Sequence, residues 1–176
     1  SEQSQSEIND RMVIVGVADS DAPDIRQEVL QIAEITKTDL LLLDSDATAD
    51  RVLESITGAT SLHVACHGRF SKEFPEASGL KCVDRWLTMA EIAGSELNHS
   101  HITLSACDTG RASIQAVEEL IGLSSGFYAA GARSMILTLW PVDDRRTASL
   151  MSDFYGEHMS GISFAASLRQ AQLNVI

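Results

Sequence analysis

Short apolar segments alternate with longer segments of helical periodicity along this chain. Five segments have the length and composition of strands in a sheet that is buried on both faces: Met12–Val17, Leu40–Leu43, Leu62–Cys66, Ile102–Ala106 and Ser134–Trp140. Most of the segments between them repeat apolar residues every three or four positions, which predicts helices. Strands that alternate with helices form a parallel sheet with right-handed crossovers. The sequence therefore predicts an α/β fold: a three-layer α/β/α sandwich with a mainly parallel central sheet.

Cap and turn residues set the expected helix boundaries. The first helix is expected to be capped by Asp21 or Asp24, and the second by Asp46 or Thr48. The second helix is expected to end at Gly58, because glycine accepts the left-handed backbone that ends many helices. Further helix starts are predicted at Thr88 with Glu91 as its capping-box partner, at Gln115, at Asp143 or Asp144, and at Ser163.

Two parts of the chain do not follow this alternation. Residues 1–10 are polar and acidic, and we expect a disordered lead-in or linker there, with one domain over residues 11–176. Residues 69–84 carry aromatic, proline and glycine residues, and we expect an excursion, such as a hairpin, over the end of the third strand. A doubly wound sheet often continues with one more strand, so we expect a final strand beyond Ile176.

Charge and composition exclude several classes of protein. The net charge of −12 argues against nucleic acid and anionic membranes as partners, since both attract basic surfaces. No apolar run approaches the roughly 20 residues that cross a bilayer, and no signal peptide is visible. The three cysteines are odd in number and irregularly spaced, which favours a reducing, cytoplasmic location over a disulfide framework.

Candidate chemistry gathers where two predicted strands end. The fourth strand ends at Cys107, followed by a turn to Gly110, and the third ends at His67 and Gly68. Sites in open α/β sheets form outside the carboxyl ends of the strands. If these two strands are parallel neighbours, His67 and Cys107 emerge at the same edge, and a base within reach of a thiol makes a nucleophile. The N–H groups of Gly68 and Cys107 are the candidate oxyanion hole.

The remaining histidine and cysteines of these strands have simpler interpretations. Cys66 points to the opposite face from His67 by strand alternation, which predicts a core position, and Cys82 lies in the excursion. His63 shares a face with His67, but no carboxylate accompanies the pair at ligand spacing, so we expect a hydrogen-bonded support and no metal site.

Four charged residues near the same edge are candidates for binding a substrate. Asp143 and Asp144 follow the fifth strand, where either one caps a helix or Asp144 pairs with a basic side chain. Arg69 and Arg111 each follow one of the proposed catalytic segments and would favour an acidic side chain instead, although such arginines are more often solvated.

Several segments, taken in order, resemble the CHAT domains, a family of caspase-like cysteine peptidase domains. They are Leu62-His-Val-Ala-Cys-His-Gly68, Leu104-Ser-Ala-Cys-Asp-Thr-Gly110, Ala130-Gly-Ala-Arg133, Leu139-Trp-Pro-Val-Asp-Asp144, Phe154-Tyr155 and Ala166-Ser-Leu-Arg-Gln-Ala-Gln172. The resemblance implies a caspase-haemoglobinase-like fold and places the family's dyad on His67 and Cys107, with oxyanion donors on Gly68 and Cys107. It also implies attachment to tetratricopeptide repeats or other regulatory domains. In separase, a relative that recognises a basic residue, the matching acidic position falls near Asp144.

The sequence thus predicts a cysteine endopeptidase that cleaves protein or peptide substrates without a cofactor. The chain departs from the family at Asp108, where Glu is usual, and in the loop over residues 111–119, where the family is rich in glycine. The rival interpretation is therefore an inactive interaction module of the same fold. A nucleotide-binding flavodoxin-like domain is disfavoured, because neither a G-x-G-x-x-G motif nor a P-loop follows the first strand.

Overall fold

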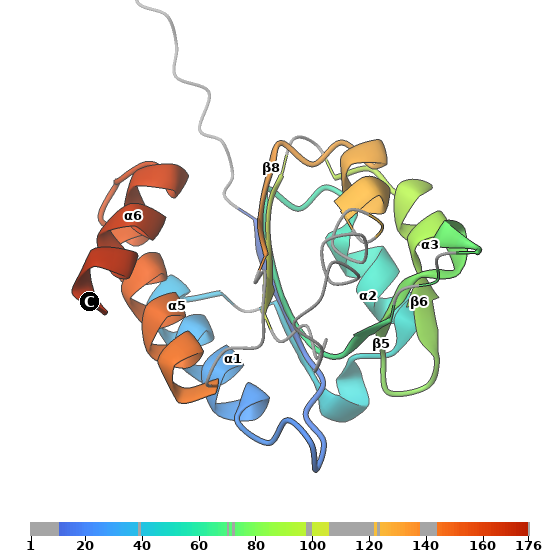
Figure 1. Ribbon diagram of the computed structural model, residues 1–176, viewed down its shortest axis with the longest axis horizontal. Helices are drawn as coiled ribbons and strands as arrows, with labels where there is room; N and C mark the ends of the chain where they lie inside the picture. The colour runs from blue at the N-terminus through green and yellow to red at the C-terminus, as the bar shows by residue number, and fades with distance from the viewer. Residues whose placement is uncertain are drawn as a thin grey trace, which may run out of the picture.

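A five-stranded parallel sheet forms the centre of the molecule (Figure 1). The computed structural model describes residues 11–38, 40–69, 71, 73–97, 100–105, 122, 124–137 and 144–175. The strand order is β2-β1-β3-β7-β8, and every neighbouring pair is parallel. The strands are β1 (Met12–Gly16), β2 (Leu41–Leu43), β3 (Ser61–Ala65), β7 (His101–Ser105) and β8 (Ser134–Leu137). All five predicted strands are present, and the predicted ends at Ala106 and at 138–140 lie outside the described residues.

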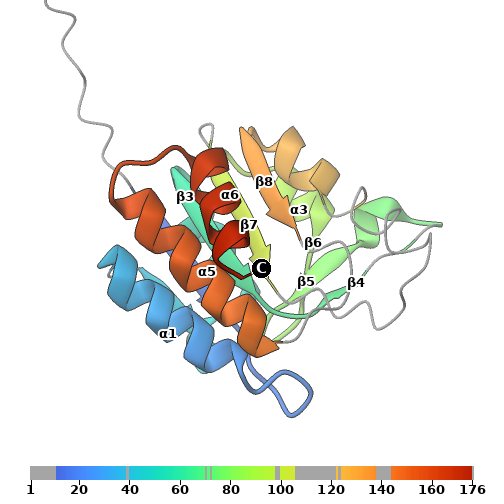
Figure 2. The ribbon, with the colours of Figure 1, turned by 60° about the vertical axis from the view of Figure 1, so that its left-hand side comes forward.

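Helices cover both faces of this sheet and make the predicted three layers (Figures 1 and 2). One face carries α1 (Ile25–Thr36), α5 (Asp144–Met159) and α6 (Phe164–Asn174). The other face carries α2 (Ala49–Ile56), α3 (Met89–Ala93) and the helical residues 124–129. Two separate apolar clusters fill the spaces between the layers, with alternate residues of β1 and β3 in each. The alternation explains why every residue of these two strands is buried.

Helix α1 packs against the end of β1 so closely that only glycine fits there. A Cβ added at Gly16 would lie 2.9 Å from Val29 Cγ2 and 3.2 Å from Leu43 Cδ1. Both distances are below ordinary van der Waals contact. The small residue at the end of β1 therefore determines how near α1 lies to the strand ends.

The helix caps partly follow the sequence prediction. Thr48 caps α2, since its side chain accepts a hydrogen bond from the backbone N–H of Arg51, and Asp46 lies instead in a preceding 3-10 turn (Asp44–Asp46). The last residue of α2 is Ile56, because Thr57 already has extended backbone angles, and Gly58 just beyond it has the expected left-handed φ, 75°, in the turn that follows the helix. Asp24 and Ser163 occupy the N-cap positions of α1 and α6 without a side-chain cap hydrogen bond.

The excursion after β3 is a second, antiparallel sheet of three strands, and not a single hairpin. Its strands are β4 (Gly68–Arg69), β5 (Gly79–Lys81) and β6 (Trp86–Thr88), with a 3-10 turn at Pro75–Ala77. The third strand starts two residues beyond the expected end of the excursion. Strands β5 and β6 approach closely, since a Cβ added at Gly79 would lie 2.5 Å from the carbonyl oxygen of Leu87.

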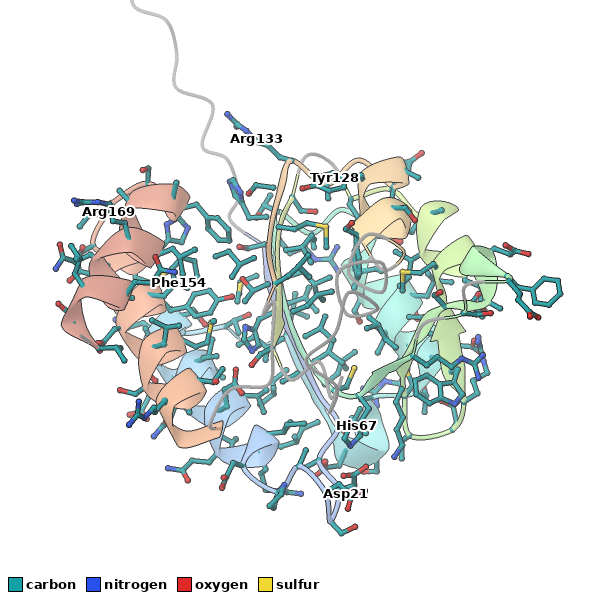
Figure 3. All side chains as sticks on the ribbon, viewed as in Figure 1. Asp21, His67, Tyr128, Arg133, Phe154 and Arg169 are labelled. Carbon is teal, nitrogen blue, oxygen red and sulfur yellow. The ribbon has the colours of Figure 1, made fainter. Side chains whose placement is uncertain are left out.

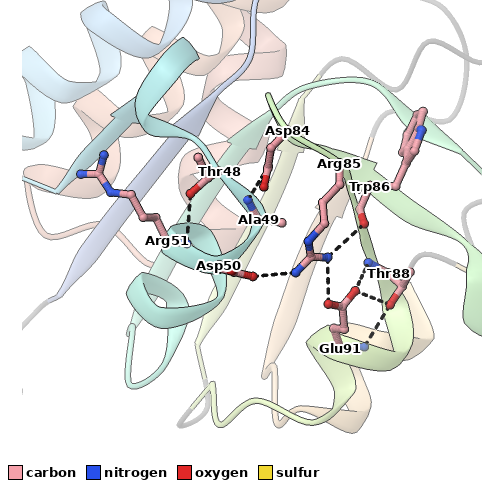
Figure 4. A network of polar contacts seen from close by, with 9 residues as sticks. All are labelled: Thr48, Ala49, Asp50, Arg51, Asp84, Arg85, Trp86, Thr88 and Glu91. Atoms are coloured by element: carbon pink, nitrogen blue, oxygen red, sulfur yellow. Dashed lines mark hydrogen bonds and ion pairs between the residues drawn. The ribbon is translucent and has the colours of Figure 1, made fainter.

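A polar network ties this small sheet to helices α2 and α3 (Figure 4). Arg85 donates to Asp50 of α2 at 2.7 Å and to Glu91 of α3 at 2.8 Å. The predicted capping box is confirmed: Thr88 accepts from the Glu91 N–H, and Glu91 accepts from the Thr88 N–H. The hydroxyl and the backbone N–H of Thr88, followed by the Arg85 guanidinium, hold the pKa of Glu91 below its usual range. The excursion is therefore held at a defined position over the end of the sheet.

A buried polar chain joins helices α1 and α5 to the two central strands. The Tyr155 hydroxyl of α5 donates to Thr103 Oγ1 of β7 at 3.2 Å and lies 3.2 Å from His63 Nδ1 of β3. His63 Nε2 lies 3.2 Å from Glu28 Oε1 of α1. The expected supporting role of His63 is confirmed by these contacts. Because the site residues follow β3 and β7, this chain fixes the platform beneath them.

Removing the Tyr155 hydroxyl is expected to destabilise the fold. Tyr155→Phe leaves Thr103 and His63, both fully buried, without the hydroxyl partner, which costs about 1–3 kcal/mol. Urea unfolding measures this loss as a lower midpoint. Tyr128→Phe is the matched control, since Tyr128 is 53% exposed and its change should stay within about 0.5 kcal/mol. Equal losses for the two variants would contradict the role of the buried chain.

Candidate active site

The carboxyl ends of β3 and β7 lie side by side. The strands are parallel neighbours, and their register pairs Ala65 with Ser105. His67 follows Ala65 by two residues, and Cys107 follows Ser105 by two residues. The predicted adjacency of the two strands is confirmed, while Cys107 itself lies outside the described residues. Figure 3 shows His67 at one end of the sheet, near Asp21, with Tyr128 and Arg133 at the opposite end.

His67 is held by the carboxylate of Asp19. This residue follows β1, which pairs with β3 on the side opposite to β7. The His67 side chain is 12% exposed, and its Nε2 lies 3.1 Å from Asp19 Oδ1. Asp19 comes three residues after the end of β1, and β1 pairs with β3 along its whole length. The ends of three adjacent strands, β1, β3 and β7, therefore meet where His67 lies.

Asp19 is also bound by a lysine from the excursion. Lys81 Nζ of β5 donates to Asp19 Oδ2 at 2.7 Å, and the backbone N–H groups of Asp21 and Ala22 donate to Asp19 Oδ1. The Lys81 ammonium, followed by the His67 imidazole, holds the pKa of the Asp19 carboxyl well below its usual range. Asp19 is therefore an ionised carboxylate that faces His67 at neutral pH.

The N–H of Gly68 points away from the strand that pairs with it. Gly68 is opposite Leu80 in the antiparallel β4–β5 pair, and the Lys81 N–H donates to the His67 carbonyl at 2.8 Å. This pattern makes Gly68–Leu80 a non-hydrogen-bonded pair, in which the N–H groups of both residues are directed outward from the ladder. The Gly68 N–H is thus oriented toward the side of β4 that is opposite to β5.

The structure describes the charged candidates for substrate binding to different extents. The guanidinium of Arg69 lies 4.7 Å from the ring centre of Trp86, and its Nε–H donates to the Ala77 carbonyl. Asp144 is the first residue of α5, so its backbone position agrees with the predicted helix start. The side chain of Asp144 and the whole of Asp143, Asp108 and Arg111 lie outside the described residues.

The two described cysteines are both buried. Cys66 is 4% exposed and belongs to the apolar cluster on the α2 side, so its predicted core position is confirmed. Cys82 is 5% exposed, and burial raises its pKa to about 11. A thiol with so high a pKa carries almost no thiolate at neutral pH, and the thiolate is the reactive form.

Sequence reasoning missed Asp19 and Lys81. Asp19 carries the same signal as His67, namely a polar residue just beyond the end of a buried strand, but the turn-forming residues that follow it give the same pattern without a site. Lys81 had no such signal, because the three-stranded excursion brings it to the site from outside the parallel sheet. Among the residues that the structure describes, no group of three histidine, cysteine or acidic side chains could hold a metal ion.

Comparison with known proteins places this architecture in a family. The family model described as "CHAT domain" matches residues 1–176. The chain belongs to the CHAT domain family. The caspase-like α/β architecture expected for a CHAT domain agrees with the mainly parallel sheet and its two helical layers.

Two curated relatives of this CHAT domain are much longer proteins. Tetratricopeptide repeat protein 28 of Mus musculus is 22% identical over 187 residues, and its Homo sapiens counterpart is 21% identical over 187 residues. Each alignment covers 85% of this chain but 8% of the relative. In the described part of the chain, no helix has the length and apolar character needed to cross a membrane.

The ion pairs of Asp19 predict a specific dependence of stability on pH. The pKa of the Asp19 carboxyl is lower in the folded state than in the unfolded state. The stabilisation is therefore complete above the unfolded-state pKa of about 4, and it is lost as the pH falls below that pKa toward the folded-state pKa. Asp19→Asn should therefore lower the free energy of unfolding by about 1–2 kcal/mol at pH 7. Chemical unfolding from pH 7 to pH 3 should show this difference shrinking in acid. A constant difference would contradict the ion-pair origin, and Asp21→Asn controls for removal of one charge.

Proposed function

We propose that this CHAT domain is a cysteine endopeptidase in which Cys107 attacks the scissile carbonyl and His67 transfers the proton. The observation that carries the proposal is the pairing of β3 with β7, with Ala65 opposite Ser105. Neighbouring parallel strands lie about 4.8 Å apart, and two extended residues span at most about 7 Å. The segments that carry the proposed nucleophile and base therefore start side by side, each two residues past its strand, and this supports the proposed dyad.

The proposed reaction uses a thiolate that His67 generates. The imidazole takes the proton of the Cys107 thiol, and the thiolate forms a bond to the carbonyl carbon. The N–H groups of Gly68 and Cys107 donate to the resulting oxyanion, and the outward direction of the Gly68 N–H supports this role. The imidazolium then gives its proton to the leaving amine as the peptide bond breaks. A water molecule hydrolyses the thioester and restores the thiol.

The substrate is a protein or peptide, and its side-chain preference is proposed to come from Asp144. Helix α5 follows β8, whose carboxyl end lies at the same edge of the sheet as those of β3 and β7. A carboxylate there would pair with a basic side chain, and Asp143 would cap the helix. Arg111 remains a proposed contact for an acidic side chain, whereas the stacking of Arg69 on Trp86 leaves its guanidinium already engaged.

The domain is proposed to act within a larger regulated protein. The curated relatives are named as tetratricopeptide repeat proteins, and this chain corresponds to 8% of their length. Repeats of that kind are the proposed neighbours of the domain. The odd number and irregular spacing of the three cysteines favour a reducing compartment such as the cytoplasm.

Cleavage of a peptide library tests the proposed activity. The wild-type chain should release products, and Cys107→Ala should reduce kcat/KM by at least about a thousandfold, because it removes the atom that forms the covalent intermediate. His67→Ala should reduce it by about 10²–10⁴-fold through loss of proton transfer. Activity that survives Cys107→Ala would refute the assignment of the nucleophile.

A thiol-reactive peptide probe separates the peptidase from an inactive interaction module of the same fold. In the peptidase, Cys107 should be labelled far faster than the buried Cys82, whose raised pKa keeps it a thiol. Cys66 serves as a second buried reference. Equal labelling of Cys107 and Cys82, together with no peptide cleavage, would favour the interaction module.

The cleavage profile also tests the proposed pocket residue. Asp144→Asn removes the charge and retains the shape of the side chain, so a preference for a basic residue before the cut should weaken by about ten- to a hundredfold in kcat/KM. Asp153→Asn on the same helix is the matched control for loss of one charge. An unchanged profile would contradict the pairing of Asp144 with substrate.

A further inference from the structure

We infer that Asp19 is a positioning residue that determines which ring nitrogen of His67 serves as the base. The inference rests on the proposed peptidase function and adds a third residue to it. Asp19 Oδ1 lies 3.1 Å from His67 Nε2, within hydrogen-bond distance. No resemblance or motif pointed to this residue, and it comes from a different strand end than either member of the proposed dyad.

The contact fixes the tautomer of His67. An ionised carboxylate has no proton to donate and can only accept, so Nε2 must carry the proton in this hydrogen bond. A neutral imidazole has one protonated and one unprotonated nitrogen, which places the lone pair on Nδ1. Nδ1 is therefore the nitrogen that takes the proton of the Cys107 thiol and later returns it to the leaving amine.

Asp19 is itself held in place by four donors. Its Oδ1 accepts from the N–H groups of Asp21 at 3.0 Å and Ala22 at 3.2 Å, besides His67, and its Oδ2 accepts from Lys81 at 2.7 Å. These donors come from the loop after β1, from the residues after β3 and from β5. A carboxylate with both oxygens engaged cannot rotate without losing several charge-assisted bonds.

Lys81 closes a ring of contacts around His67. Its side chain binds Asp19, and its backbone N–H donates to the His67 carbonyl at 2.8 Å. Lys81 thus holds the His67 imidazole indirectly, through Asp19, and holds the His67 backbone directly, through its own N–H. The excursion, anchored by the Arg85 network, contributes a positively charged group that keeps Asp19 ionised next to the imidazole.

A purely structural role for Asp19 makes different predictions. The turn at Asp21 and Ala22 needs only an oxygen that accepts two N–H groups, and an asparagine supplies such an oxygen. An asparagine lacks the negative charge, and its NH₂ group would face either Lys81 or His67 as a second donor. Asp19→Asn therefore preserves the turn while it removes what the positioning role requires.

The test combines kinetics with the protonation of the ring. In the purified chain, Asp19→Asn should lower kcat by about ten- to a hundredfold while KM stays within about twofold, because orientation of the base acts on the chemical step. Lys81→Met should lower kcat in the same direction, and Lys81→Arg should restore most of it. Glu54→Gln, which removes one charge from an exposed residue of α2 away from the site, should leave the kinetics unchanged. Melting temperatures of all variants separate loss of folding from loss of positioning.

Nitrogen NMR of ¹⁵N-histidine-labelled chain supplies a readout that a structural role would not move. The His67 signals, assigned by their loss in His67→Gln, should show a protonated Nε2 and an unprotonated Nδ1, and Asp19→Asn should shift the population toward the other tautomer. A wild-type His67 protonated on Nδ1 would overturn the inference. A wild-type kcat in Asp19→Asn, measured where Cys107→Ala is inactive, would also overturn the inference. That outcome would leave the proposed peptidase function intact. A wild-type chain that cleaves no peptide would overturn the peptidase function together with this role.

Discussion

Parallel pairing of β3 with β1 on one side and with β7 on the other is the constraint on which the candidate site depends. Parallel strands end at the same edge of a sheet, so groups that follow them meet in space even when they are remote in the chain. Asp19 and His67 are separated by 48 residues and lie in hydrogen-bond contact. The register of β3 against β7 pairs Ala65 with Ser105, which precede His67 and Cys107 by two residues each. Loss of either pairing would separate the groups that the proposed chemistry needs.

Helices α1 and α5 hold the two central strands in place through buried polar contacts. Tyr155 of α5 reaches through the apolar cluster to Thr103 of β7 and His63 of β3, and Glu28 of α1 meets the other side of the same histidine. Buried polar groups of this kind are costly unless partnered, so they favour one arrangement of helices over the sheet. His63 therefore stabilises strand β3, which leads to His67, and has no part in the proposed reaction. His63 lies within β3, whereas His67 follows the end of that strand.

The excursion after β3 connects the candidate site to a part of the fold that lies outside the parallel sheet. It carries Gly68, whose N–H is directed away from β5, and Lys81, which binds Asp19. Arg85 joins it to α2 through Asp50 and to α3 through Glu91 (Figure 4). A displacement of this small sheet would therefore act on the Asp19–His67 contact and on the proposed oxyanion donor together.

Local chemistry explains why so much of the architecture was predictable. The five apolar segments, the helical periodicity between them and the capping box at Thr88 and Glu91 depend on neighbours in the chain. The structure confirms the strands and the capping box, while the helix start predicted at Gln115 lies outside the described residues. The position of His67 at a strand end, the core position of Cys66 and the supporting role of His63 followed from strand alternation. The segments shared with CHAT domains indicated the family before any contact was known.

The sequence by itself determined the layers, the parallel sheet and the family, because hydrophobic periodicity and caps are short-range properties that are written in consecutive residues. The tertiary structure alone decided that β1 and β7 flank β3, that the excursion forms three strands, and that Asp19 and Lys81 meet at His67. These contacts join residues 48 and 62 positions apart. No local pattern encodes such contacts, since they depend on the register of strands and on the path of a loop through space.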